Sequence, residues 1–196
     1  MTRWVVFDYG NVLSEPHTGL TDLAGLLNAP ATRFEEVYWS FRLAYDHGMS
    51  DLEYWQSVGK ALDVEVTEDL AAELKQADFE VWLRASPSAV SLVEDLSTAG
   101  VPLALLSNAP SSFGQALADK PWTRHFKHLV FSGDLGVAKP SPEIWTSTTN
   151  LLGSSNCIFF DDRPENVAGA VEAGWTGIEW HGPTHARTEL THLGLL

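Results

Sequence analysis

A short apolar segment near the start of the chain runs directly into a carboxylate. Residues 4–7 are bulky or β-branched, Asp8 follows them, and Gly10 and Asn11 form a turn. Such a run predicts a buried parallel strand. Asp8 then lies at the carboxyl end of that strand, the edge of an open α/β sheet at which ligands bind. A carboxylate there can act as a nucleophile or bind a hard metal, although an Asp that simply ends a strand is an equally ordinary interpretation.

A long helical stretch follows, and the chain then alternates between helices and strands. Capping-box patterns at Thr32–Glu35 and Ser50–Glu53 open two helices, and Thr67 caps a third. Ser-Pro pairs begin later helices, and glycines end them. The expected helices cover residues 21–27, 32–47, 51–62, 67–79, 87–99, 142–152 and 164–173, and the expected strands cover residues 4–7, 101–106, 129–131, 157–160 and 176–180.

This order of elements predicts an α/β fold with an insertion. Alternating strands and helices imply a parallel sheet with helices on both faces. The stretch between the first strand and the strand that begins at Val101 is too long for one ordinary crossover. Residues 14–86 are therefore predicted to form a helical cap, a small bundle inserted into an α/β core of residues 1–13 and 87–196.

The composition is that of a globular, acidic protein. Of 196 residues, 44% are hydrophobic, 26 are acidic and 12 are basic, which gives a net charge of −14. This charge argues against nucleic acid or an anionic membrane as a partner, and an anionic substrate would need a local cation. The one cysteine, Cys157, excludes an internal disulfide and fits a reducing compartment. Since the sequence has no signal-peptide pattern and no membrane-length apolar run, we expect a cytoplasmic protein, of an oligomeric state that the sequence does not indicate.

Polar side chains follow three of the predicted strands directly. Asp8 follows the first, Ser107–Asn108 follow the second, and Asp161–Asp162 follow the strand at 157–160. A parallel sheet gathers these ends at one edge, and Lys139, just before a predicted helix, can reach the same edge. Each group alone is more often an ordinary turn or surface loop. Together they offer a nucleophile, groups that hold anionic oxygens, a cation, and carboxylates for a divalent metal.

These residues and their order resemble the haloacid dehalogenase-like (HAD) hydrolase superfamily. The resemblance spans the chain and rests on four motifs, Val5–Asp8, Leu105–Asn108, Lys139–Pro140 and Ile158–Asp162. The inserted helices look like the family's helical cap of the first type, and the segment from Tyr45 to Trp55 is similar to a cap segment of its sugar phosphatases. The resemblance implies a Rossmann-like sheet with the first strand in the centre.

The resemblance also implies a reaction. Asp8 would attack the phosphorus of a small phosphate monoester to form an aspartyl-phosphate, which water then hydrolyses. Mg²⁺ would be held by Asp8, the Gly10 carbonyl and Asp162, with Asp161 as a further ligand or directly behind one. The transferred oxygens would be held by Ser107, the amides of Asn108 and Ala109, and Lys139.

Position 10 departs from the pattern of most phosphatases of the superfamily, which carry a second Asp two residues after the nucleophile. That Asp protonates the leaving oxygen and activates water, a role typically worth about 10²–10⁴-fold. The Asp8-x-Gly10-Asn11 form resembles a subgroup that includes bacterial glucose-1-phosphate phosphatases. An anomeric sugar phosphate is a good leaving group, so we expect a sugar 1-phosphate as substrate. The pKa of a histidine suits an acid, but we expect that His17 does not take this role.

Side chains of the predicted cap are candidates to contact the substrate. Four of them lie on one predicted helix that could face the site, namely Trp39, Arg42, Tyr45 and His47. Lids commonly complete such sites, and we expect one or two of these residues to do so.

Two other functions remain open. A 2-haloacid dehalogenase uses the same nucleophile without a metal, but Asp161 and Asp162 argue against it, because paired carboxylates beside an attacking carboxylate make sense chiefly around a cation. A catalytically weak binding or regulatory protein could have kept the fold and lost the chemistry at Gly10. Retention of Asp8, Lys139 and Asp162 argues against this second alternative.

Overall fold

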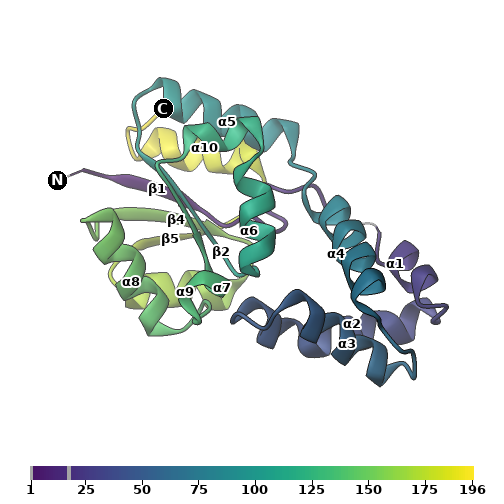
Figure 1. The fold of residues 1–196 in the computed structure, drawn as a ribbon. Helices are drawn as coiled ribbons and strands as arrows, with labels where there is room; N and C mark the ends of the chain where they lie inside the picture. Colours follow the sequence, from purple (N-terminus) through teal and green to yellow (C-terminus); the bar gives the residue numbers. More distant parts are fainter. Residues whose placement is uncertain (1, 17–18) are drawn as a thin grey trace.

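The computed structural model describes residues 2–16 and 19–196 and contains one parallel sheet (Figure 1). The strand order is β3-β2-β1-β4-β5, so β1 is central. This confirms the predicted α/β fold and the position of the first strand. The strands are β1 (Trp4–Phe7), β2 (Leu103–Ser107), β3 (His128–Phe131), β4 (Cys157–Asp161) and β5 (Thr176–Glu179). Phe7 pairs with Leu105 on one side and with Phe160 on the other.

Helices cover both faces of the sheet because alternate residues of each buried strand point in opposite directions. Val5 and Phe7 belong to the hydrophobic cluster of one face, and Trp4 and Val6 belong to that of the other. The first face is covered by α5 (Pro87–Thr98), α6 (Ser111–Ala118), a 3₁₀ helix (Pro121–His125) and α10 (Pro183–His192). The second face is covered by α8 (Pro142–Leu152) and α9 (Pro164–Glu172), and the short α7 (Ser132–Leu135) follows β3.

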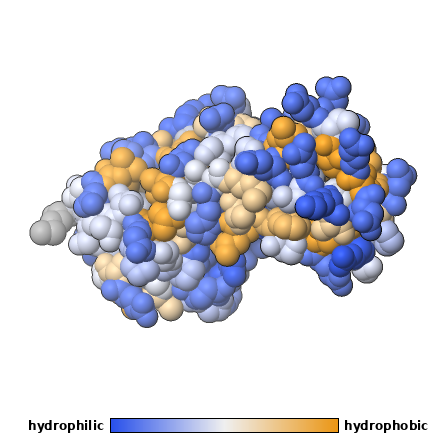
Figure 2. Space-filling view, turned by 60° about the horizontal axis from the view of Figure 1, so that its bottom comes forward, coloured by the Kyte–Doolittle hydropathy of each residue, from blue (hydrophilic) through white to orange (hydrophobic). Residues whose placement is uncertain are grey.

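The four remaining helices pack around a hydrophobic core of their own, separate from the sheet (Figure 1). They are α1 (Leu20–Leu26), α2 (Ala31–Asp46), α3 (Asp51–Ala61) and α4 (Glu68–Trp82). The two connections to the core run side by side, because Ser14 and Ala85 form an isolated antiparallel bridge. We propose that the domain boundary lies there, in agreement with residues 14–86, and we call this range the helical insert. The outline of the molecule narrows between core and insert (Figure 2).

Two of the three predicted helix caps are confirmed. Ser50 and Glu53 form a complete capping box at α3, and Thr67 accepts a hydrogen bond from the Leu70 amide at the start of α4. The predicted box at Thr32 is wrong, because α2 begins at Ala31 and Pro30 occupies the N-cap position without a side-chain bond. Proline at that position fixes its own φ, and the helix starts two residues earlier than Thr32 as N-cap would give.

The C-terminal segment forms a helix, α10, for which the sequence offers no motif. Ala186 and Leu190 are fully buried in the first-face cluster, where α10 packs against α5. Arg187 forms an ion pair with Asp95 of α5 at 2.5 Å. None of the helices in the described part of the chain has the length and apolar character of a membrane span.

Candidate active site

The carboxyl ends of the central strands bring the predicted residues together. Asp8 follows β1, Ser107 ends β2, and Asp161 ends β4. Because β1 lies between β2 and β4, the three side chains share one edge of the sheet. All three residues are buried, Asp161 completely.

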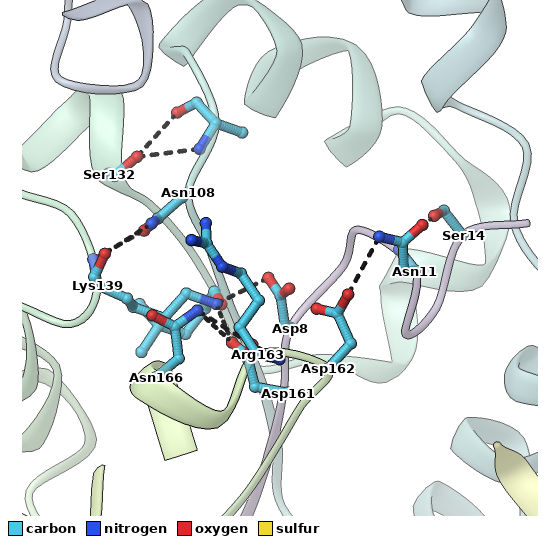
Figure 3. A network of polar contacts seen from close by, with 12 residues as sticks. Asp8, Asn11, Ser14, Asn108, Ser132, Lys139, Asp161, Asp162, Arg163 and Asn166 are labelled. Carbon is cyan, nitrogen blue, oxygen red and sulfur yellow. Dashed lines mark hydrogen bonds and ion pairs between the residues drawn. The ribbon is translucent and has the colours of Figure 1, made fainter. Parts of the chain in front are cut away.

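Lys139 closes the site from the loop before α8. Its Nζ donates to Asp8 Oδ1 at 2.8 Å, to Asp161 Oδ2 at 2.6 Å (Figure 3), and to the Leu106 carbonyl at 2.9 Å. Three acceptors satisfy the three protons of an ammonium group. The Asn108 side chain holds the loop in place, since its Oδ1 accepts from the Lys139 amide at 2.8 Å and its Nδ2 donates to the Lys139 carbonyl at 2.9 Å. Asn108 therefore fixes the position of Lys139.

Asp161 is surrounded by donors of the protein itself. Asn166 Nδ2 lies 3.0 Å from both of its oxygens, the Arg163 amide donates to Oδ1 at 2.9 Å, and Lys139 occupies Oδ2 (Figure 3). A carboxylate with both oxygens engaged in this way orients the lysine. These contacts favour an indirect role for Asp161, in which it holds Lys139 and does not coordinate the metal ion directly.

Asp8 and Asp162, with Asp161 beside them, give the site a donor set that fits a hard divalent cation. Asp8, Asp161 and Asp162 each offer an oxygen, and these oxygens lie within 4.8 Å of one another. Asp162 is half-buried and accepts a hydrogen bond from Asn11 Nδ2 at 3.1 Å. Mg²⁺ prefers oxygen ligands and commonly uses one or two carboxylates. Gly10 lines a cavity at this sheet edge together with Asp8 and Asp162, and its carbonyl stays a predicted ligand.

The site carries more negative than positive charge. Within residues 2–16 and 19–196, Lys139 is the cation that forms ion pairs with Asp8 and Asp161. Burial raises the pKa of Asp8 although the attraction of Lys139 opposes it, and burial also raises the pKa of Asp162. Burial by itself lowers the pKa of Lys139, but the attraction of Asp8 and Asp161 is stronger than this effect, so the pKa of Lys139 is raised. The lysine stays charged, and a further cation would favour ionisation of the carboxylates.

The segment predicted to bind phosphate lines the same cavity with Ser107, Asn108 and Ala109. The Ala109 amide, however, donates to the hydroxyl of the buried Ser132 at 2.9 Å. The prediction that this amide holds a transferred oxygen is therefore wrong, because a tertiary contact already uses its N–H. The Ser107 hydroxyl and the Asn108 amide stay predicted donors.

A cavity of about 490 Å³ lies between the core and the helical insert. It contains the edge of the sheet described above, and its insert side is lined by Trp39, Arg42, Leu43, Asp46 and Trp82. Trp39 and Arg42 thus lie where the sequence analysis expects substrate-contacting residues.

Two other candidates of the same helix point elsewhere. Tyr45 is fully buried and its hydroxyl donates to Asp51 at 2.6 Å. His47 Nδ1 lies 2.6 Å from the carbonyl of Leu43, one turn back on its own helix. Trp39 and Arg42 thus stay the two predicted substrate contacts of the four candidates, and Tyr45 and His47 are not among the residues that line the cavity. His17 lies outside the described residues.

Arg42 is a fixed cation on the insert side of the cavity. Its Nε donates to Asp46 Oδ1 at 3.0 Å, and its Nη1 lies 3.7 Å from Asp78 Oδ2. Its guanidinium group also lies 5.5 Å from the ring centroid of Tyr38 and 5.7 Å from that of Trp82. Two carboxylates and aromatic faces hold this guanidinium rigidly, which suits recognition of a polar substrate.

The family of the chain follows from a comparison with known sequences. A family model described as haloacid dehalogenase-like hydrolase matches residues 2–174. The chain belongs to this family. The matched range includes β1 to β4 and every residue of the sheet edge described above, and it ends before β5.

Relatives of this HAD-like hydrolase include two kinds of enzyme. It is 37% identical over 62 residues to flavin mononucleotide hydrolase 1 of Arabidopsis thaliana, a match that covers 31% of this chain and only 25% of that protein. It is 26% identical over 192 residues to (S)-2-haloacid dehalogenase 4A of Burkholderia cepacia, covering 90% of this chain and 81% of that protein. A HAD family enzyme of Bacteroides thetaiotaomicron, solved with magnesium and inorganic phosphate, has the same fold, with a TM-score of 0.72, 17% identity and coverage of 92% and 93%.

Three residues of this HAD-like hydrolase's site are not indicated by the sequence analysis. Asn166 lies on the first turns of α9, and its five-residue distance from Asp161 is the signal that could have identified it. Ser132 lies on α7, which is too short for a periodic pattern. Asp46 ends α2, and its place at the cavity depends on how the helical insert packs on the core.

Proposed function

We propose that the chain is a Mg²⁺-dependent phosphatase that hydrolyses a small phosphate monoester, such as a sugar 1-phosphate. The observation that carries the proposal is the position of Asp162. It adds a carboxylate beside Asp8, in a site where Lys139 already pairs with Asp8 and Asp161. An uncompensated carboxylate next to an anionic nucleophile is unfavourable unless a cation binds there.

The residues of the chain divide the reaction among them. Asp8, with one oxygen held by Lys139, is placed to attack phosphorus with the other, and an aspartyl-phosphate is the expected intermediate. Ser107 and the Asn108 amide hold the transferred oxygens by donating to them. Lys139, whose three protons go to Asp8, Asp161 and the Leu106 carbonyl, orients the nucleophile and adds positive charge beside it. Mg²⁺, bound through Asp8 and Asp162, would offset the repulsion between the nucleophile and the phosphoryl group.

The cavity supports a small substrate with polar groups. Its volume of about 490 Å³ lies in the range of small-molecule sites. Arg42 and Asp46 offer a donor and an acceptor for hydroxyl groups, and Trp39 offers an aromatic face, the combination that suits a sugar. This supports a sugar phosphate over a simple alkyl phosphate.

Dehalogenation of a 2-haloacid is the second candidate, and the 26% identity to the Burkholderia cepacia dehalogenase favours it. It needs Asp8 and no metal. A third possibility, a HAD-fold binding protein of weak activity, rests on Gly10 alone. Dependence of turnover on Mg²⁺ separates the phosphatase from the dehalogenase, and the absence of turnover distinguishes the binding protein from both.

The test is phosphate release from sugar phosphates and p-nitrophenyl phosphate, by the wild type and by Asp8→Asn and Asp162→Asn, each with Mg²⁺ and with chelator. Asp119→Asn, at an exposed position at the end of α6, is the matched control. We expect turnover that requires Asp8, Asp162 and Mg²⁺ and is unchanged in the control. Chloride release from 2-chloropropionate that persists in chelator would refute the proposal and establish the dehalogenase. No Asp8-dependent turnover of either kind would favour the binding protein.

A further inference from the structure

Hydrolysis of an ordinary sugar phosphate is accelerated by a proton donor, and at the sheet edge neither Lys139 nor position 10 supplies one. The departing sugar oxygen must be protonated as it leaves phosphorus. All three protons of Lys139 are donated to Asp8, Asp161 and the Leu106 carbonyl. Position 10, on the loop after Asp8, is a glycine. Among the described residues, the other wall of the cavity, which belongs to the helical insert, is a second place from which a donor can come.

Asp46 is the carboxyl group that this wall contributes. It lines the same cavity as Asp8, and its side chain is 13% exposed. Its carbonyl accepts a hydrogen bond of 2.6 Å from Ser132 Oγ, and the same hydroxyl accepts from the Ala109 amide. One part-buried and one buried hydrogen bond thus connect the end of α2, through Ser132, to the segment after β2, next to Ser107 and Asn108.

The surroundings of Asp46 favour a carboxyl group that can both give and take a proton near neutral pH. Burial raises its pKa to about 6, which Arg42 and His47 oppose and Asp78 supports. Arg42 Nε bonds to one oxygen, Oδ1, so a proton on the other oxygen does not break this bond. The efficiency of general acid–base catalysis is highest when the pKa lies near the working pH.

We propose that Asp46 is the general acid and base of the reaction, supplied by the helical insert. This rests on the proposed phosphatase function. As Asp8 attacks, the bond between phosphorus and the sugar oxygen breaks, and that oxygen takes the proton of the Asp46 carboxyl group. Water then attacks the aspartyl-phosphate and gives its proton to the Asp46 carboxylate, while the bond from phosphorus to Asp8 breaks and inorganic phosphate leaves.

The proposal changes the expected substrate range. An enzyme without an acid is restricted to phosphates with good leaving groups, such as anomeric ones. An enzyme with Asp46 as the acid also hydrolyses ordinary alkyl phosphates, including those on a primary sugar hydroxyl. The factor by which replacing Asp46 lowers kcat/KM must then increase as the leaving group becomes poorer.

The experiment measures kcat/KM of the wild type and Asp46→Asn, with Mg²⁺, on p-nitrophenyl phosphate, glucose 1-phosphate and glucose 6-phosphate. Asn keeps the shape of the side chain and an oxygen for Arg42. We expect a loss of at least about 100-fold on glucose 6-phosphate, a smaller loss on glucose 1-phosphate, and less than about 10-fold on p-nitrophenyl phosphate, whose leaving group departs without a proton.

The matched control is Asp51→Asn. Asp51 is a second acidic residue of the insert that bonds to the core, through Ser112 at 2.5 Å, but it does not line the cavity. Its replacement should not distinguish the three substrates. For Asp46→Asn, an equal loss on all three substrates, or no loss, overturns the proposal while the phosphatase function stands. Turnover of p-nitrophenyl phosphate also shows that the variant is folded. If the wild type releases no more phosphate than Asp8→Asn from any of the three substrates, the proposed function itself is overturned.

Discussion

Replacing Asp8 by Asn is expected to stabilise the folded chain at neutral pH when no divalent metal is present. Asp8 is 7% exposed, and burial raises its pKa from the ordinary 3.8 to about 7 despite Lys139. The folded state therefore keeps a proton that the unfolded state releases between about pH 4 and pH 7. By linkage, the wild type loses stability as the pH rises through this window. Asn carries no charge and does not share this loss.

The magnitude follows from the two pKa values. At about 1.4 kcal/mol for each pKa unit, the change from 3.8 to about 7 corresponds to at most roughly 4 kcal/mol. The free energy of unfolding of Asp8→Asn minus that of the wild type should rise toward this value between pH 4 and pH 7. Mg²⁺ should reduce the difference, because it binds the ionised carboxylate, and at 100 times its Kd a ligand stabilises a protein by about 2.7 kcal/mol.

The assay is urea unfolding followed by tryptophan fluorescence, from pH 5 to pH 8, in chelator and in excess Mg²⁺. The eight tryptophans give a strong signal. Asp119→Asn again serves as the control for loss of an exposed carboxylate. A difference for Asp8→Asn that is constant across this range would refute the reasoning, since the charge of Asp8 would then have no cost in the folded state. A difference that Mg²⁺ leaves unchanged would contradict metal binding at Asp8.

Three further outcomes are expected, each measured by urea unfolding. Ser50→Ala should lower the free energy of unfolding by about 1 kcal/mol because it removes the capping box of α3, whereas Thr32→Ala should leave it nearly unchanged because Thr32 caps nothing. Lys139→Met should destabilise the chain by about 3–5 kcal/mol, since it leaves buried carboxylates unpaired, and adding Asp161→Asn should recover part of that loss; additive effects would contradict their pairing. Leu190→Ala should cost about 2–5 kcal/mol, and a smaller loss would show that α10 does not stabilise the core as it packs here.

The sheet and its edge could be predicted from sequence because each depends on local patterns. Continuous apolar runs identify β1, β2 and β4, and a parallel sheet necessarily gathers the residues that follow them. Asp8, Ser107 and Asp161 therefore meet without any knowledge of the loops. Lys139 required one more step, its place before a helix that begins with proline.

The failures share a physical cause, which is competition from a contact or residue outside the local pattern. The Ala109 amide is adjacent to the predicted segment, but Ser132 from another part of the chain takes its N–H. Thr32 has the spacing of a capping box, but Pro30 starts the helix earlier. Tyr45 lies on the predicted helix, but the packing of α2 against α3 and α4 turns it inward. The Ala109 and Tyr45 outcomes depend on tertiary contacts that the spacing of residues does not encode, whereas the Thr32 outcome depends on a neighbouring proline.

The hydroxyl of Ser132 connects the two walls of the cavity. It donates to the Asp46 carbonyl of the insert and accepts from the Ala109 amide of the core, and it is completely buried. Moving α2 away would break this 2.6 Å bond and leave the hydroxyl only its longer contact of 3.4 Å to the Ala109 carbonyl. The arrangement with Asp46 at the cavity is therefore favoured even without a substrate. In the proposed mechanism, a proton donor held in this way needs no large rearrangement of the insert to reach the leaving oxygen, so a chain with glycine at position 10 would retain acid catalysis.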